Sequence, residues 1–149
     1  MNKTAKNNNI TIIGLSDMSI FILESLVSSN RNYNITLIYD KKEQDENNIS
    51  LNKFSNIINL KSESLLNSYT FNSNENSNNI LTICATNDYK LNLLFSALIK
   101  SSENSDNIFC YVNNSQYHDL FKKEDIVTFN PWNLPKNLGS KTLFFQLYK

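Results

Sequence analysis

A turn that begins at Gly14 carries residue types that could hold a phosphate group. It joins an apolar run, Ile10–Ile13, to a segment with helical spacing. In a dinucleotide-binding turn of the form G-x-G-x-x-G, the glycines allow the tight turn, the approach of the pyrophosphate and the packing of helix on strand. This chain keeps Gly14 but has Ser16 and Ser19 at the other two positions. The Ser16 hydroxyl could donate to a phosphate, or the turn could be a plain connection without phosphate affinity, and the sequence leaves both open.

An acidic residue, Asp40, follows the second apolar run, Ile35–Tyr39. It stands about 26 residues after Gly14, near the spacing at which dinucleotide-binding folds place the carboxylate that binds the ribose. Aspartate also favours strand ends and turns for local reasons. Ribose binding and a local structural role therefore both remain open for Asp40.

A polar stretch, Ala85–Asp88, follows the apolar run Ile80–Cys84 and precedes the best helical pattern of the chain. Open α/β sheets hold their ligands at the carboxyl ends of their strands. Thr86 and Asn87 are therefore candidates for one wall of a ligand crevice. One residue among Thr86, Asn87 and Asp88 could also cap the helix that follows.

Apolar runs alternate with amphipathic segments along the chain. The expected strands are Ile10–Ile13, Ile35–Tyr39, Ile57–Leu60, Ile80–Cys84, Ile108–Val112 and Ile126–Phe129. The expected helices are Asp17–Ser29, Asn87–Lys100 and Ser115–Lys123, with shorter helical segments at Ile49–Phe54 and Ser62–Tyr69, a charged loop at Lys41–Glu46 and an Asn-rich loop at residues 72–79. This alternation predicts a single-domain α/β protein with a doubly wound, Rossmann-like parallel sheet in three α/β/α layers. No internal repeat with a convincing period is expected.

Spacing also predicts which side chains face the sheet. The expected apolar stripes are Ile20, Leu23, Leu26 and Val27 in the first helix, Leu91, Leu94, Phe95 and Leu98 in the second, and Tyr117, Leu120 and Phe121 in the third.

Net charge argues against nucleic-acid binding. The 149 residues contain 14 Lys and Arg against 14 Asp and Glu, so no basic field is expected to attract nucleic acid.

The cysteines and the histidine give no sign of catalysis or of a metal site. The two cysteines, Cys84 and Cys110, lie in apolar runs and are expected to be free buried thiols. The only histidine, His118, has no nucleophile or metal ligand at a suitable spacing, so catalysis is not expected. The polar N-terminus and the lack of a long apolar run predict a cytoplasmic protein.

Several stretches together resemble one family. They are Ile12-Ile13-Gly14-Leu15 with Leu37-Ile38-Tyr39-Asp40, then Cys84-Ala85-Thr86-Asn87-Asp88-Tyr89-Lys90-Leu91-Asn92-Leu93-Leu94, and finally Val112-Asn113-Asn114-Ser115-Gln116-Tyr117-His118-Asp119-Leu120-Phe121-Lys122-Lys123 followed by Ile126-Val127 and Asn130-Pro131. In this order they resemble the TrkA-N or RCK N-lobe, the cytosolic regulatory domain of potassium channels and of Trk/Ktr-type uptake systems. The resemblance covers residues 9–132, leaving residues 1–8 as a flexible N-terminus and 133–149 as a tail that could dock or form an interface.

The resemblance implies a regulatory lobe that binds NAD(H) or ATP/ADP and is not an enzyme. Such lobes form homo-oligomers, as dimers or rings, on a membrane potassium channel or transporter subunit at the inner face of the membrane. The cofactor-binding residues that it implies here are Gly14, Ser16, Asp17, Met18, Asp40, Lys41, Ser62, Ala85, Thr86 and Asn87.

Two departures from the family pattern keep other interpretations open. The second and third turn glycines are replaced, and Lys61-Ser62 stands where the family has a Gly-Asp pair near the adenine. A degenerate lobe that keeps only an assembly surface is one alternative. The other is the NAD-dependent dehydrogenase domain of siroheme synthesis, which shares an Ala-Thr-Asn-Asp after its fourth strand.

Overall fold

Six strands form one sheet in the order β3-β2-β1-β4-β5-β6, and every neighbouring pair is parallel. The structure is a computed structural model that describes residues 9–29, 31–64, 79–103, 108–114, 117–122 and 126–130, with the backbone alone for 79, 80, 102, 103 and 118. The order reverses between β1 and β4, as in doubly wound sheets. This confirms the predicted single-domain, Rossmann-like α/β fold.

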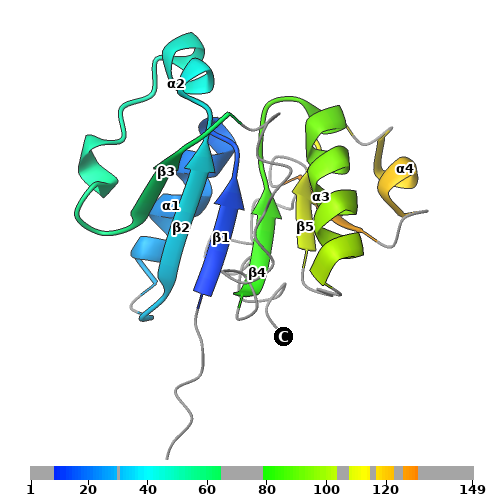
Figure 1. Ribbon diagram of the computed structural model, residues 1–149, viewed down its shortest axis with the longest axis horizontal. Helices are drawn as coiled ribbons and strands as arrows, with labels where there is room; N and C mark the ends of the chain where they lie inside the picture. The colour runs from blue at the N-terminus through cyan, green and yellow to red at the C-terminus, as the bar shows by residue number, and fades with distance from the viewer. Residues whose placement is uncertain are drawn as a thin grey trace, which may run out of the picture.

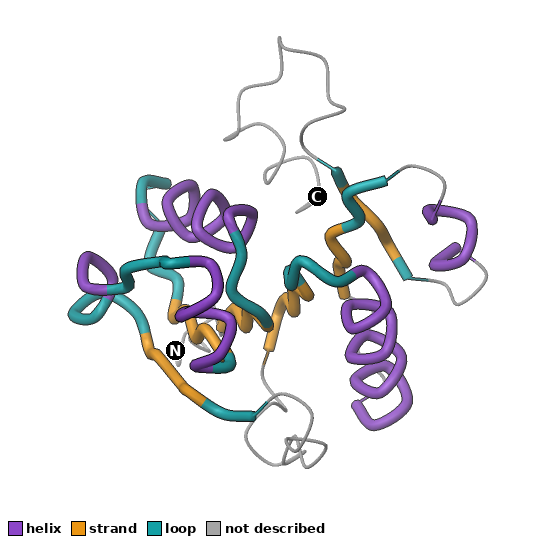
Figure 2. The backbone as a smooth tube through the Cα atoms, turned by 90° about the horizontal axis from the view of Figure 1, so that it is seen from above, coloured by secondary structure: helices purple, strands orange, loops and turns teal. Residues whose placement is uncertain are grey.

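The elements alternate along the chain as the sequence predicts. The strands are β1 (Asn9–Ile13), β2 (Asn34–Tyr39), β3 (Asn59–Ser62), β4 (Asn79–Cys84), β5 (Ile108–Tyr111) and β6 (Val127–Phe129). The helices are α1 (Asp17–Val27), α2 (Lys41–Asn47), the short 3-10 helix η1 (Asn52–Phe54), α3 (Tyr89–Glu103) and α4 (His118–Lys122). Helix α1 lies on one face of the sheet, and α3 and α4 lie on the other (Figures 1 and 2).

The segment Lys41–Glu46, predicted as a charged loop, is instead most of helix α2. Its ends explain the error. Asp40 and Glu43 form a capping box at the amino end, and Asn48 adopts a left-handed conformation (φ 50°) at the carboxyl end. These caps satisfy backbone groups that a short helix would otherwise leave free, so the helix forms without an apolar stripe.

Other boundaries also differ from the prediction. Strand β3 begins at Asn59 and not at Ile57, whose side chain is 58% exposed. Ser62 ends this strand and does not begin a helix, and residues 65–69 lie outside the described residues. Of the third expected helix, Ser115–Lys123, the described helical part is α4. The N-terminus 1–8, most of the Asn-rich loop and the tail 133–149 also lie outside the described residues.

Strands β1 and β2 carry nearly the same sequence, NITII and NITLI, and they pair in register. Asn9 therefore lies beside Asn34 and Thr11 beside Thr36, while Thr82 of β4 lies on the other side of Thr11. The Asn34 amide donates to the Asn9 side-chain oxygen (2.9 Å), and the Asn59 amide donates to that of Asn34 (3.1 Å). These matched rows fix the strand register, because slippage would separate like side chains.

The faces of the two longest helices match the predicted apolar stripes only in part: Leu23, Leu26 and Phe95 are buried as predicted. Helix α1 buries Met18, Ser19, Ile22, Leu23 and Leu26, so Ile20 and Val27 are not in the buried set. Helix α3 buries Asn92, Phe95, Ser96 and Ile99, whereas Leu94 is 38% exposed. The buried faces also carry polar residues, and two of them, Ser19 and Asn92, bond to backbone groups at the strand ends.

Phe95 and Leu94 provide a matched test of this face of α3. Phe95 is completely buried in the core between α3 and the sheet. Replacing it with Ala should cost about 3–5 kcal/mol of unfolding free energy, as for other buried aromatic residues. Leu94→Ala should cost less than about 1 kcal/mol, because that side chain is already partly in water. Chemical denaturation measures both, and equal losses would contradict the assigned face.

Candidate functional site

The carboxyl ends of β1, β2 and β4 meet at one edge of the sheet, and the predicted site residues gather there. Helix α2 lies over this edge, above the strand ends and not against either face (Figures 1 and 2). The turn after β1, the end of β2 and the polar stretch after β4 therefore lie together in one region, which we call the crevice after its counterpart in other open α/β sheets. In an open α/β sheet this region is the usual place for a ligand.

Gly14 is required by the close approach of the neighbouring strand end. Its φ is +100°, and a Cβ built on it would lie 2.3 Å from Thr86 Cγ2 and 2.7 Å from the Thr86 backbone nitrogen. The Gly14 N–H donates to the Ile38 carbonyl (2.8 Å), and the Ala85 N–H donates to the Ile13 carbonyl (2.8 Å). Gly14 thus lies where the ends of β1, β2 and β4 come together. This packing is a sufficient reason for a glycine at this position, even without a bound phosphate.

The serines at the second and third turn positions bind the polar stretch after β4. Ser16 caps α1, and its hydroxyl donates to the Ala85 carbonyl (2.6 Å) while accepting from the Ser19 N–H (3.2 Å). The Ser19 hydroxyl lies 2.8 Å from the same carbonyl and 2.6 Å from that of Gly14. Both serines are fully buried. Their hydroxyls are already used within the protein, so donation to a phosphate would require breaking these bonds.

Asn92 binds the next peptide from the opposite face of the sheet. This buried residue of α3 accepts with its side-chain oxygen from the Thr86 N–H (2.9 Å) and the Thr86 hydroxyl (2.7 Å). Its amide donates to the carbonyls of Thr86 (3.1 Å) and Tyr111 (2.9 Å). Since all four bonding positions of the side-chain amide are occupied, Asn92 satisfies polar groups that burial would otherwise leave unpaired.

The N–H group of Leu15, in the turn after β1, is already bonded to a carboxyl group of the protein. Oε2 of Glu43, on α2, accepts from the Leu15 N–H (3.2 Å) and from the Asp40 N–H (3.1 Å). Burial raises the pKa of the Glu43 carboxyl, and the nearby carboxylates of Asp40 and Glu46 act in the same direction. The two backbone N–H groups oppose this by stabilising the ionised form.

Asp40 directly follows β2, where the ribose-binding acid was predicted, but its side chain serves the backbone. Its Oδ1 accepts from the Lys42 N–H (2.9 Å), which makes Asp40 the N-cap of α2. The local interpretation of Asp40 therefore has direct structural support, and a role toward ribose stays a prediction.

The remaining predicted residues differ in their burial and in their position relative to the crevice. Ala85 and Thr86 are buried beside Gly14, and Met18 is buried in the core behind the turn. Asn87 is exposed, and its amide donates to the side-chain oxygen of Asn47 on α2 (3.2 Å). The exposed residues Asp17, Lys41 and Ser62 stand at the start of α1, the start of α2 and the end of β3.

Four important residues of the crevice were missed in the sequence: Ser19 as a hydroxyl donor, Glu43, Asn47 and Asn92. The spacing Asp40-x-x-Glu43 is a capping-box signature and could have predicted both α2 and the direction of the Glu43 side chain. Asn92 interrupts the apolar residues of α3, and a polar residue at such a position is a sign of a buried bond. No comparable signal identifies Asn47.

Other chemical groups of the described chain offer no second site. Cys84 and Cys110 are free and buried on adjacent strands, as predicted, and burial raises the pKa of the Cys110 thiol. Among the described residues, no three His, Cys, Asp or Glu side chains gather as metal ligands, and no helix is both long and apolar enough to cross a membrane.

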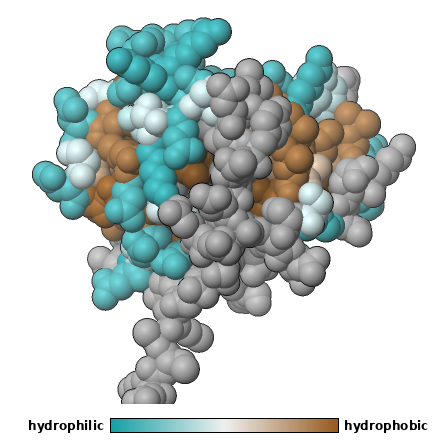
Figure 3. Space-filling model, in the orientation of Figure 1, coloured by the Kyte–Doolittle hydropathy of each residue, from teal (hydrophilic) through white to brown (hydrophobic). Residues whose placement is uncertain are grey.

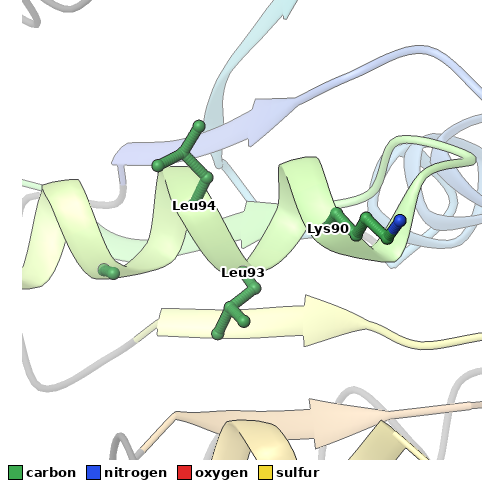
Figure 4. A pocket seen from close by; sticks show the side chains of 4 residues that line it. Lys90, Leu93 and Leu94 are labelled. Carbon is green, nitrogen blue, oxygen red and sulfur yellow. The ribbon is translucent and has the colours of Figure 1, made fainter.

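A surface hollow of about 400 Å³ lies away from the crevice, along the outer side of α3. It is lined by Lys90, Leu93, Leu94 and Ala97, which recur at helical spacing (Figure 4). Hydrophobic side chains gather over α3 in the same region (Figure 3). With a single Lys as its only charged residue, this hollow has no group for acid–base or metal chemistry.

Comparison with known proteins does not identify a family. No family model matches the chain, and no curated protein matches it significantly. The resemblance to the TrkA-N or RCK N-lobe therefore remains an expectation from the residues alone, while the fold itself is established by the sheet order.

Gly14→Ala tests the close contact between the turn and Thr86. The substitution should destabilise the protein by more than about 2 kcal/mol, because it combines a positive φ with a collision against backbone atoms. Equilibrium denaturation measures the loss. A stability within about 0.5 kcal/mol of the parent protein would contradict the described geometry.

Glu43→Gln tests the partly buried carboxylate through pH. The folded protein holds the Glu43 proton more tightly than the unfolded chain, because the folded pKa is raised from the ordinary value of 4.5. The contribution of Glu43 to the stability of the parent protein should therefore fall as pH rises through the window between 4.5 and the raised value. Glutamine can keep the acceptor oxygen without titrating, so the stability of the variant relative to the parent should increase with pH over that window. Denaturation at a series of pH values measures this, and a constant difference would argue against a buried carboxylate.

Proposed function

We propose that this chain is a non-catalytic regulatory lobe of an ion-transport assembly, with a nucleotide crevice closed by its own side chains. The resemblance to the TrkA-N or RCK N-lobe supports the class of assembly. The doubly wound sheet, with its order reversal between β1 and β4, is the fold that such a lobe requires. In this proposal the lobe acts through contacts with partner subunits of a potassium channel or transporter.

One observation carries the closed crevice: the Glu43 carboxylate accepts from the Leu15 N–H at the turn where a phosphate would bind. A phosphate brought to this turn would meet a like charge and would have to replace Glu43 as the acceptor. The hydroxyls of Ser16 and Ser19 are engaged with Ala85, and the Asp40 carboxylate caps α2. Each contact that a dinucleotide would make here competes with a contact within the protein.

A nucleotide-gated lobe is the second candidate. It is favoured by the positions of Gly14 and Asp40, which directly follow β1 and β2 at the edge where nucleotides bind to doubly wound sheets. The two candidates differ in whether a nucleotide has enough affinity to displace Glu43.

Ligand-dependent stability separates these candidates. The closed lobe predicts no increase in Tm with millimolar NAD, NADH, ATP or ADP, confirmed by the absence of heat in titration calorimetry. A nucleotide at about 100 times its Kd would stabilise the protein by about 2.7 kcal/mol, a clear shift for this chain length. Such a shift would overturn the closed lobe, and its weakening by Asp40→Ala would then support the nucleotide-gated lobe with Asp40 at the ribose.

A further inference from the structure

Helix α2 is an unusual element of this fold because none of its seven residues is buried. Its sequence, Lys41–Asn47, is entirely polar, and it forms a hydrophilic cap at the carboxyl edge of the sheet (Figure 3). Its ion pair, Lys42–Glu46, is exposed and lies within the helix itself. The hydrophobic effect therefore contributes little to its position, and elements of this kind have low local stability.

Two side chains of α2 hold one residue of the turn. Glu43 and Asn47 are four residues apart and so lie on the same side of the helix. Glu43 accepts from the Leu15 N–H (3.2 Å), and the Asn47 amide lies 3.4 Å from the Leu15 carbonyl oxygen. The side-chain oxygen of Asn47 accepts from Asn87, which follows β4. Helix α2 thus begins at the end of β2 and reaches the ends of both β1 and β4.

We propose that α2 is a releasable latch, in which Glu43 and Asn47 close the crevice over Leu15 and Asn87 and separate from them without unfolding of the sheet. This deepens the proposed function, since it takes the closed crevice as the resting state and names the element whose movement opens it. The hinge points are Asp40 and the left-handed Asn48, which bound the helix. The strand ends beneath are held independently by the bonds of Ser16, Ser19 and Asn92, so they stay in place when α2 moves.

Burial of the Glu43 carboxylate favours this release. The groups around it are the backbone N–H groups of Leu15 and Asp40 and the carboxylates of Asp40 and Glu46. Burial raises the pKa of Glu43, so the ionised side chain regains favourable hydration when the latch opens.

Amide hydrogen exchange by NMR on the full chain tests the latch. In the parent protein, the amides of α2 and of Leu15 should exchange at least about a hundredfold faster than those of Leu37 and Ile83 in the sheet, because they open locally. Glu43→Ala should speed exchange at Leu15 a further tenfold or so, while Glu43→Gln, which keeps an acceptor, should have a smaller effect. Asp45→Ala is the matched control, since it alters an exposed residue of the same helix that neither contacts Leu15 nor acts on the Glu43 carboxyl, and it should leave Leu15 unchanged.

Two results would overturn the proposal. One is exchange of α2 and Leu15 in the parent protein at the rate of the sheet, which would make α2 part of the global unfolding unit. The other is the same Leu15 exchange rate in Glu43→Ala as in the parent. Neither result depends on nucleotide binding, so a failed latch is distinguishable from a failed closed lobe.

Discussion

The peptide units of Ala85 and Thr86 are bound from both faces of the sheet, and the arrangement of the crevice depends on this constraint. From one face, Ser16 and Ser19 at the start of α1 hold the Ala85 carbonyl. From the other face, Asn92 of α3 holds the N–H and the carbonyl of Thr86. Helices on opposite sides of the sheet are therefore joined through two consecutive residues. Buried backbone groups at a strand end need partners, and here polar side chains from both layers supply them.

This double attachment explains why sequence reasoning predicted the fold better than the site. Continuous apolar strands are fixed by burial on both faces, so their order and approximate limits follow from the residues alone. Asn92 lies on the buried face of α3 and bonds to Thr86 and Tyr111, contacts that apolar periodicity cannot detect. Of the predicted stripe, Phe95 is buried and Leu94 is not. The charged residues of α2 resembled a loop because a seven-residue helix without an apolar face leaves only its capping residues as a signal.

Most of the predicted site residues lie at or just after strand ends at one edge of the sheet, but many of them serve the protein's own structure. Asp40 directly follows β2 as expected, yet its carboxylate caps a helix. Gly14 permits the approach of Thr86 and leaves no room for even one additional carbon atom. A turn of the dinucleotide-binding type can therefore persist in a sequence because it joins three strand ends, whether or not a ligand binds there. Whether such a turn serves packing or ligand binding depends here on the positions of Glu43 and Asn47. Both residues lie on α2, a helix that the sequence pattern did not predict.

The near identity of β1 and β2 has a consequence for how the chain finds its topology. Both strands begin Asn-Ile-Thr and therefore offer almost the same side chains to a neighbouring strand. The energy of strand pairing alone then discriminates poorly between the position of β1 in the sheet and that of β2. The connections therefore help to distinguish the two positions, since the turn at Gly14 packs closely against Thr86 after β4, and α1 connects β1 to β2 on the other side.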